Sequence, residues 1–347
     1  MKLITFTVPC YNSEGYMRKC IDSLLVGGED VEIIIVDDGS TDNTANIADE
    51  YVKNYPTICR VCHKPNGGHG SGVNKGIELA TGLYFKVVDS DDYLEKTALI
   101  ELIKIIKNHL LMNEEADLYV TNFIYDKQYD GTQYVSDYKS KFPVRKFFTW
   151  NDTKPLRLWK MLLMHSLLYK TDKLRESNIK LPEHTFYVDN IYAYVPLPYM
   201  KKIYYLDVNL YMYYIGRPGQ SVSLDNIVKR YDQQIRVMNI MLNSYTYDEI
   251  CKMDKKLRKD MLHILYVIMN NTIFFTTAKD SKERRELYYD MWSSLKRNDI
   301  KLYNYLKHHT SIRIFNVFTW NLKGFISLTA YKFLCKYVKL GVWRKLE

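Results

Sequence analysis

The sequence predicts an α/β catalytic domain followed by a helical domain. Short apolar runs recur through the first hundred residues, and each is followed by a polar loop and a helix-like stretch. This alternation is typical of an open, mostly parallel sheet that is flanked by helices. The apolar runs lie at residues 2–8, 31–36 and 57–62 and directly before Asp89.

The pattern changes near residue 225. Turn signals become rare there, and apolar residues recur at helical spacing, which predicts a helical domain. A chain of 347 residues with 47% hydrophobic residues is long enough for two modules. We therefore expect an α/β domain over residues 1–220 and a helical domain over residues 221–347. The helical spacing is clearest at Ile227, Tyr231, Ile235, Met238 and Leu242.

Three carboxylates, Asp89, Asp91 and Asp92, follow the fourth apolar run in the segment VVDSDDY. Hard divalent ions such as Mg²⁺ or Mn²⁺ take oxygen ligands and bind through one or two carboxylates together with substrate phosphates. The D-x-D spacing therefore suits a metal ion and a nucleotide diphosphate. By itself the motif also fits a solvated turn, or Asp92 as the cap of a helix that begins near Glu95.

Polar loops follow the other three apolar runs as well. In an open α/β sheet the ligand lies outside the carboxyl ends of the strands, so we expect all four loops to meet in one crevice. The first three loops begin at Pro9, Asp37 and Pro65.

In order, the four loops contain VPCYN, VDDGSTD, NGG and DSDD, at residues 8–12, 36–42, 66–68 and 89–92. This series resembles the family 2 glycosyltransferases, which have the Rossmann-like GT-A fold. The resemblance implies a UDP-sugar donor, a divalent metal ion (Mn²⁺ or Mg²⁺) and inversion at the anomeric carbon. The resemblance covers residues 1–100, which we expect to bind the nucleotide sugar, and we expect residues 101–220 to form the acceptor half.

The resemblance assigns roles to several loop residues. Asp38 would hydrogen-bond the base, Asp89 would lie near the ribose and the metal ion, and Asp91 would be a direct metal ligand. A carboxylate suits this role of Asp38, because the N3–H group of the nucleobase uracil is a hydrogen-bond donor. The alternative is that Asp38 caps the helix predicted near Thr41, where an acid contributes about 0.3–1 kcal/mol. The predicted donor-binding residues of these loops are Pro9, Tyr11, Asn12, Asp38, Gly68, Asn74, Asp89 and Ser90.

The glycine-rich loop departs from the family pattern. Glycine tolerates the dihedral angles that a backbone cradle for phosphates needs. Many family members carry an A-R-N triplet here, whereas this chain has Gly72-Val73-Asn74. Lys75 and His69 are the nearby candidates for neutralising the diphosphate.

A carboxylate is also expected as the base that deprotonates the acceptor hydroxyl. Family members carry this aspartate in an E-D dipeptide, which Val188-Asp189 matches with the glutamate lost. We predict Asp189 as the base, with a helix N-cap as the alternative. His184 and Thr185, just before it, are weaker candidates for the acceptor pocket. His165, inside MLLMHSLLY, is interpreted as a packing residue and left out of the site.

A tyrosine-rich strand is expected over residues 202–214, followed by a loop with Arg217 and Ser221. A guanidinium binds phosphate oxygens through a bidentate fork, and a loop with glycines can close over a donor. Arg217 and Ser221 are therefore predicted to hold the leaving group. The alternative interpretation is an ordinary exposed turn.

The end of the chain is basic. Residues 300–346 contain nine Lys or Arg and no Asp or Glu, which equals the formal net charge of +9 of the whole chain. Aromatic residues interleave with these charges, so we expect an amphipathic surface for anionic lipid. The alternative is a helix that packs on the core with solvated lysines. Nucleic acid is not expected as a partner, because no binding module is recognisable.

The cysteines and the N-terminus favour a cytoplasmic protein. Cys59 and Cys62 have C-x-x-C spacing, but no second Cys/His pair completes a zinc site. No signal peptide precedes the first predicted strand. We therefore expect a cytoplasmic protein that is peripheral at the inner face of the cell membrane.

The leading hypothesis is an inverting hexosyl- or N-acetylhexosaminyltransferase. It would transfer a sugar from a UDP-sugar to a glycan, plausibly a lipid-linked precursor of a bacterial surface polysaccharide. The alternatives are a sugar-phosphate nucleotidyltransferase and an inactive membrane-associated scaffold. The sequence determines neither the donor sugar, the acceptor, the linkage nor the oligomeric state.

Overall fold

A computed structural model describes the protein at residues 2–127, 131–156, 160–216, 224–308, 310 and 312–337. The chain divides into two compact units. The first contains residues 1–154 and 162–214, and the second contains residues 155–161 and 215–347. Each unit is described by itself below.

The first part of unit 1 is the predicted succession of strands and helices. Strands β1, β2 and β4 are mostly apolar and are buried along their whole length, as is typical of parallel strands covered on both faces. They form parallel pairs, β1 with β2 and β4 and β2 with β3, in the order β3-β2-β1-β4. The elements are β1 (Ile4–Cys10), α1 (Met17–Leu25), β2 (Val31–Asp37), α2 (Thr44–Asn54), β3 (Cys59–His63), α3 (His69–Leu79) and β4 (Tyr84–Val87).

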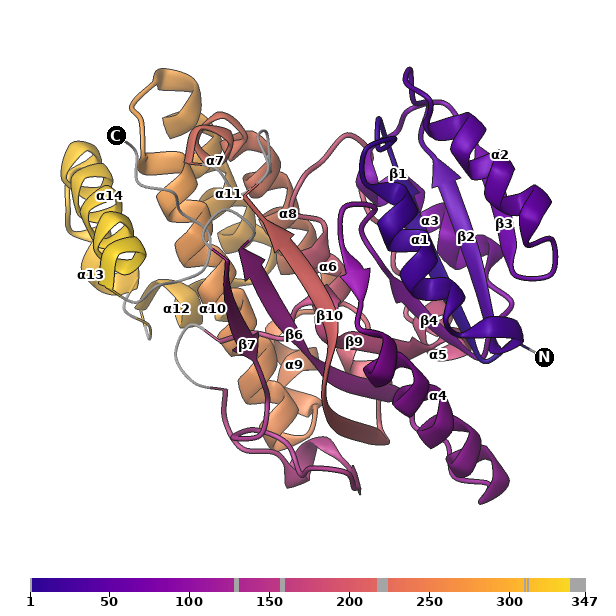
Figure 1. Cartoon of the computed structure of the whole chain (residues 1–347). Helices are drawn as coiled ribbons and strands as arrows, with labels where there is room; N and C mark the ends of the chain where they lie inside the picture. Colours follow the sequence, from indigo (N-terminus) through magenta and orange to yellow (C-terminus); the bar gives the residue numbers. More distant parts are fainter. Residues whose placement is uncertain are drawn as a thin grey trace. The chain divides into compact units, whose positions relative to one another are not determined.

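The second part of unit 1 continues the same sheet with antiparallel pairs. β9 pairs with β4 and with β6, so the parallel half joins an antiparallel half at β4. The sheet continues in the order β9-β6-β10-β5. β7 lies beside β6 (Figure 1). This α/β sheet confirms the predicted fold class. The elements are β5 (Tyr93–Leu94), α4 (Lys96–Leu111), β6 (Leu118–Lys127), β7 (Thr132–Ser136), β8 (Phe147–Phe148), β9 (Leu167–Lys170), α5 (Thr171–Glu176), α6 (Asp189–Tyr194) and β10 (Ile203–Ile215).

The cap of α4 decides against one of the alternatives for the acidic loop. Glu95 is the N-cap residue, and its carboxylate accepts hydrogen bonds from Thr97 N at 3.1 Å and Ala98 N at 2.7 Å. Asp92 was considered for this position, but it lies in the preceding loop and binds β10 instead. Both carboxylate oxygens of Asp92 therefore accept hydrogen bonds from β10.

The described part of unit 2 is built from helices. Arg284 is buried and donates to Phe275 O at 2.9 Å and to Val228 O, so it joins α11 to α10 and α7. Among the residues with described structure, no helix is long and apolar enough to cross a membrane. The helices are α7 (Leu224–Lys229), α8 (Tyr231–Ser244), α9 (Tyr247–Lys252), α10 (Lys255–Thr277), α11 (Lys282–Asn298), α12 (Ile300–His308), α13 (Ile312–Asn316) and α14 (Trp320–Tyr337).

Close packing of α3 on β1 depends on Gly76. A Cβ atom at this position would lie 2.0 Å from Oγ1 of Thr7 and 2.6 Å from its Cβ. Thr7 is fully buried in β1 and cannot turn away into solvent. The absence of a side chain at residue 76 therefore lets the helix approach the strand.

We expect Gly76→Ala to destabilise the protein by about 1–3 kcal/mol, the usual cost of overpacking a core. This cost outweighs the helix propensity of alanine, which favours it over glycine by about 1 kcal/mol. Urea unfolding followed by circular dichroism measures the change. Gly15→Ala is the control, because a Cβ at Gly15 would have no neighbour within 4 Å. Equal stability of the two variants would show that α3 can shift away from β1 without cost.

Candidate functional site

The four polar loops meet at one edge of the sheet. Because β1 to β4 run parallel, their carboxyl ends lie on the same side, where α/β proteins bind ligands. Direct contacts join neighbouring loops: the hydroxyl oxygens of Ser13 and Ser90 lie 2.8 Å apart, and Asn12 N donates to Ser40 Oγ at 3.0 Å. Three loops thus form one connected surface.

Asp38 holds the glycine-rich loop in place. Its buried carboxylate accepts hydrogen bonds from Gly67 N at 3.0 Å, Gly68 N at 2.6 Å and the ammonium group of Lys64 at 2.5 Å. Gly68 has φ +81°, a left-handed conformation that favours glycine. The sequence did not predict this role for Asp38, which ties the second loop to the third.

His69 connects the glycine-rich loop to the acidic loop. It is the first residue of α3, and its Nε2 lies 2.7 Å from Oδ1 of Asp89. Burial opposes protonation of the imidazole, but the negative charge of Asp89 and its hydrogen bond outweigh burial and raise the pKa of His69. Lys75, the other candidate for neutralising the diphosphate, instead pairs with Glu78 at 2.8 Å.

Asp92 anchors the acidic loop to β10. Its carboxylate accepts hydrogen bonds from Tyr211 OH at 2.6 Å and Tyr214 N at 2.8 Å, and the residue is 1% exposed. Burial raises the pKa of Asp92 well above its usual range, and the charges of Asp91 and Asp89 raise it further. The Tyr211 hydroxyl also accepts from Asp89 N at 3.1 Å.

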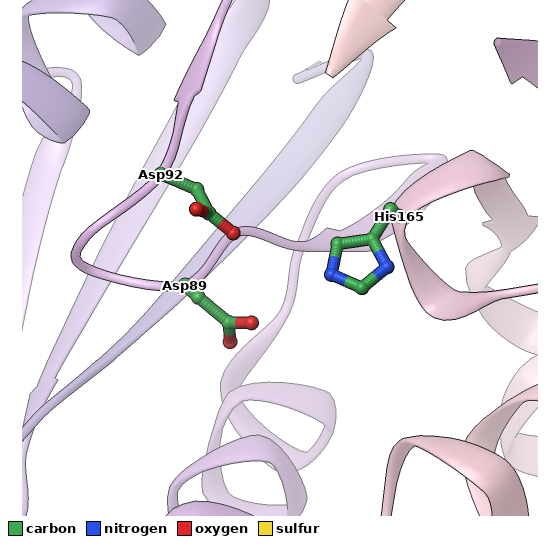
Figure 2. Close-up of side chains that lie close together, drawn as sticks. All are labelled: Asp89, Asp92 and His165. Carbon is green, nitrogen blue, oxygen red and sulfur yellow. The ribbon is translucent and has the colours of Figure 1, made fainter. Parts of the chain in front are cut away.

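A candidate metal-binding group lies at this point. Asp89, Asp92 and His165 each offer a ligand atom, and these atoms all lie within 4.8 Å of one another. Figure 2 shows the two carboxylates and the imidazole ring facing a common space. The group formed by the described residues does not include Asp91, the ligand that the resemblance implied.

The donor set fits a divalent cation. Carboxylate oxygen and imidazole nitrogen are both common ligands of divalent metal ions in proteins. In Figure 2 the ring nitrogen of His165 that faces the carboxylates is Nε2, whereas Nδ1, which is buried without a hydrogen-bond partner among the described residues, lies on the other side of the ring. Burial lowers the pKa of His165 to about 4, which keeps the imidazole in the neutral form that binds metals.

His165 therefore lies beside the acidic loop, although the sequence analysis left it out of the site. Lys86, which is fully buried in β4, donates to the carbonyl oxygens of His165 at 2.6 Å and Leu167 at 3.2 Å. Lys86 and His165 are polar residues within otherwise apolar segments. This contrast is the feature of the sequence that could have pointed to the site. The contact between Lys86 in β4 and the carbonyl oxygen of His165, which precedes β9, could not be read from either segment alone.

Asp189 lies at the start of α6 and is half-buried. Val188 is the N-cap residue of this helix and makes no side-chain cap bond. Burial raises the pKa of Asp189 to about 6; the positive charge of His69 opposes this shift and the negative charge of Asp89 adds to it. Asp189 is therefore electrostatically linked to the acidic loop and is a carboxylate at neutral pH.

The segment before Asp189 is attached to the glycine-rich loop and to α3. His184 N donates to Gly67 O at 2.7 Å, and the buried Thr185 follows it. Asn74, a predicted donor-binding residue, instead clamps Leu181: Asn74 Nδ2 donates to Leu181 O at 2.8 Å, and Leu181 N donates to Asn74 Oδ1 at 3.0 Å.

The remaining predicted residues differ in their surroundings. Pro9 is buried at the end of β1, whereas Tyr11 is 53% exposed in the loop that follows and is accessible to a ligand. Arg217 and Ser221 lie outside the described residues.

Comparisons with known proteins agree with this architecture. The model of glycosyl transferase family 2 matches residues 5–169. An uncharacterised glycosyltransferase of Mycoplasma pneumoniae, the MG025 homologue, is 30% identical over 64% of this chain and 71% of its own length. The uncharacterised glycosyltransferase EpsJ of Bacillus subtilis is 28% identical over 83% of this chain and 84% of its own length.

A solved structure shares the fold across the whole chain. The crystal structure of residues 1–349 of S. aureus TarS in complex with UDP-GlcNAc matches with a TM-score of 0.64 and 21% sequence identity. The match covers 100% of this chain and 94% of that one. The Mycoplasma pneumoniae relative and the family match show that the chain belongs to the family 2 glycosyltransferases, and the likeness to TarS shows that it has their GT-A fold.

Proposed function

We propose that this glycosyltransferase transfers a sugar from a UDP-sugar to a hydroxyl group of a glycan, with inversion and with Asp189 as the base. The observation that carries the proposal is the position of Asp189, a half-buried carboxylate with a pKa of about 6 that interacts with Asp89 and His69. A base of this pKa is well matched to proton abstraction near neutral pH. Among the described residues, no feature of the site favours the nucleotidyltransferase or scaffold alternatives.

The donor is inferred to be a UDP-sugar, since TarS, which shares the fold, was solved with UDP-GlcNAc. We place the nucleotide at the edge formed by the four loops, with Tyr11 exposed toward the base. Asp38 serves this site by accepting hydrogen bonds from the backbone N–H groups of Gly67 and Gly68, which fixes the glycine-rich loop before α3. His69, at the N-terminus of α3, supplies positive charge where the family's arginine is missing.

The transfer is a single displacement. The acceptor oxygen forms a bond to the anomeric carbon while the bond from that carbon to the phosphate oxygen breaks, and the electron pair leaves with UDP. Asp189 takes the hydroxyl proton. A divalent cation held by Asp89, Asp92 and His165 would neutralise the developing charge on the diphosphate.

A thermal-shift screen tests the donor class. A ligand present at about 100 times its Kd stabilises the native state by about 2.7 kcal/mol. We expect UDP-sugars with Mn²⁺ to raise the melting temperature more than GDP- or CDP-sugars do, and UDP-sugars alone to have a smaller effect. A larger shift with a GDP- or CDP-sugar would contradict the donor assignment.

The role of Asp189 is tested by UDP release, with water or a glycan as acceptor. Asp189→Asn should lower the rate by about 10²–10⁴-fold, the contribution of a general base, while UDP affinity stays unchanged. Because the active form is the carboxylate, the wild-type rate should fall as the pH drops below about 6, the pKa of Asp189.

Asp172→Asn is the matched control, since Asp172 also lies in the first turn of a six-residue helix, α5. It should retain the wild-type rate and pH profile. An Asp189→Asn variant with a near-normal rate would show that Asp189 is only a helix-terminal residue.

We further propose that unit 2 docks on an anionic membrane surface, where a lipid-linked acceptor would be presented. His308, Thr310, Arg313, Ile314 and Val317 line a hollow of about 530 Å³. Ile314 is 60% exposed and Val317 is 78% exposed. Exposed apolar side chains beside Arg313, in a segment that lacks acidic residues, suit an anionic lipid interface.

Vesicle flotation tests this surface. A Val or Ile side chain contributes about 1.5–3 kcal/mol when it is fully buried, so Ile314→Ser with Val317→Ser should weaken binding to phosphatidylglycerol vesicles at least tenfold. Wild-type binding should fade with salt, because screening weakens the attraction of basic residues to the surface.

The control is Leu111→Ser with Met112→Ser, an apolar pair that is 84% and 68% exposed at the end of α4. It should bind vesicles as the wild type does, and both double variants should bind UDP normally. Equal vesicle binding by the two double variants would contradict the proposed surface.

A further inference from the structure

We propose that unit 2 contains a phosphate-binding site, formed by Lys323 and Trp320 of α14 together with Lys307 of α12. The ligand is a phosphate group, carried either by a lipid head group or by a soluble phosphorylated compound. The site goes beyond the proposed transfer and does not depend on it, because all three residues lie in unit 2. It also differs from the surface around Ile314 and Val317.

The two lysines lie over neighbouring rings of one aromatic cluster. Lys323 Nζ lies 5.6 Å from the ring centroid of Tyr288, and Lys307 Nζ lies 5.9 Å from that of Trp292 and 4.8 Å from that of Tyr303. Neighbouring ring centroids in the cluster are separated by 5.4, 6.4 and 5.9 Å. The cluster therefore brings ammonium groups from two helices to one place. Its rings are, in order, Trp320, Tyr288, Trp292 and Tyr303.

Lys323 is a buried cation without an acidic partner. The residue is 6% exposed, and its ammonium group has no carboxylate or hydrogen-bond partner among the described residues. Burial lowers the pKa of Lys323, and the positive charge of Lys307 lowers it further. A bound phosphate would offset both effects, because a nearby negative charge favours the ammonium form.

Arg284 shows how the same unit accommodates a buried cation that serves packing. It is also 6% exposed, but its guanidinium group donates to Phe275 O at 2.9 Å, to Thr276 O at 3.2 Å and to Val228 O. The protein itself thus supplies the acceptors for Arg284. Lys323 has no comparable set among the described residues, so its donors are available to a ligand.

Trp320 adds a buried donor on the same face of α14. The residue is 7% exposed, and its Nε1 has no hydrogen-bond partner among the described residues. Residues three apart share a helix face, and both Trp320 and Lys323 lie beside the ring of Tyr288. In unit 1, by contrast, the buried Trp150 donates from Nε1 to Met200 O at 2.6 Å. The indole N–H of Trp320 is therefore a donor that an oxygen of the ligand would satisfy.

Close packing of α14 on α10 holds these donors in position. A Cβ atom at Gly324 would lie 2.4 Å from Thr277 O, so α14 lies directly on the backbone of α10 at this point. Lys323, the preceding residue, is thereby kept beside α11.

Phosphate is the anion that fits this set of donors. It offers several strong acceptor oxygens in different directions, so one group can accept from two ammonium groups and an indole N–H at once. A carboxylate has only two oxygens in one plane. Residues 300–346 contain no Asp or Glu that could compete for the two lysines.

Nuclear magnetic resonance of the tryptophan side chains tests the site directly. The full chain is labelled with ¹⁵N-tryptophan, and Trp320→Phe identifies the indole resonance of Trp320. We expect this resonance to shift saturably with sodium phosphate or with bicelles that contain phosphatidylglycerol, and not with sodium chloride at the same ionic strength.

The two probes distinguish the sources of the phosphate group. A shift with sodium phosphate supports a site for a soluble ligand, and a shift with the bicelles alone supports a site for a lipid head group. If neither probe gives a saturable shift, the proposal is wrong. The assay contains no UDP-sugar, so its outcome is independent of the proposed transfer.

Lys323→Gln tests the contribution of the ammonium group. Charge-assisted hydrogen bonds are stronger than neutral ones, so we expect this variant to weaken binding of the responding probe by about tenfold or more. Lys307→Gln should weaken it as well, and it serves as the test if Lys323→Gln does not fold.

Lys282→Gln is the control, because it removes a positive charge from α11 in the same unit at a side chain that is 89% exposed. It should leave the affinity unchanged. Affinities of Lys323→Gln and Lys307→Gln equal to that of the control would overturn the assignment of the site to these lysines.

Discussion

The candidate site depends on the hydroxyl group of Tyr211, which joins the two halves of the sheet in unit 1. It donates to Asp92 at 2.6 Å and accepts from Asp89 N at 3.1 Å. Tyr211 comes from β10 in the antiparallel half, whereas the acidic loop follows β4 in the parallel half. A hydrogen-bond network in a buried setting is strong when it is complete, and it then fixes one arrangement of the groups it joins. The carboxylate of Asp92 is thus used to position its neighbour Asp89.

The same loop concentrates negative charge that must be balanced. Asp89, Asp91 and Asp92 raise one another's free energy when they are ionised, which is one reason the pKa of Asp92 is raised. His69, whose pKa is raised by Asp89, offsets part of this charge when its imidazole is protonated. A metal ion bound beside His165 would balance more. A cation and a diphosphate bound together at this loop, as proposed above, would each make the other easier to bind.

The sequence predicted the elements of the site better than the contacts inside it. The four loops could be placed at one edge because parallel strands end on one side, which follows from the alternation of apolar and polar segments. Local sequence did not show that Asp38 binds the glycine-rich loop or that Glu95 rather than Asp92 caps α4. These outcomes depend on which donors the fold brings near each carboxylate. His165 was missed for the same reason, since its apolar neighbours in the sequence are typical of a packing residue.

The position of the proposed base follows from contacts with the donor side of unit 1. Asn74 on α3 clamps Leu181 through two hydrogen bonds, and Gly67 O accepts from His184 N. A Cβ at Gly68 would lie 3.1 Å from His184 N, so this segment packs directly on the glycine-rich loop. The segment also turns sharply, with φ +46° at His184 and +65° at Tyr187. Asp189 follows this segment directly. Its position is therefore tied to that of the glycine-rich loop, which Asp38 holds in place. A donor that orders the glycine-rich loop would therefore also set the distance between the base and the sugar, since both depend on the same backbone.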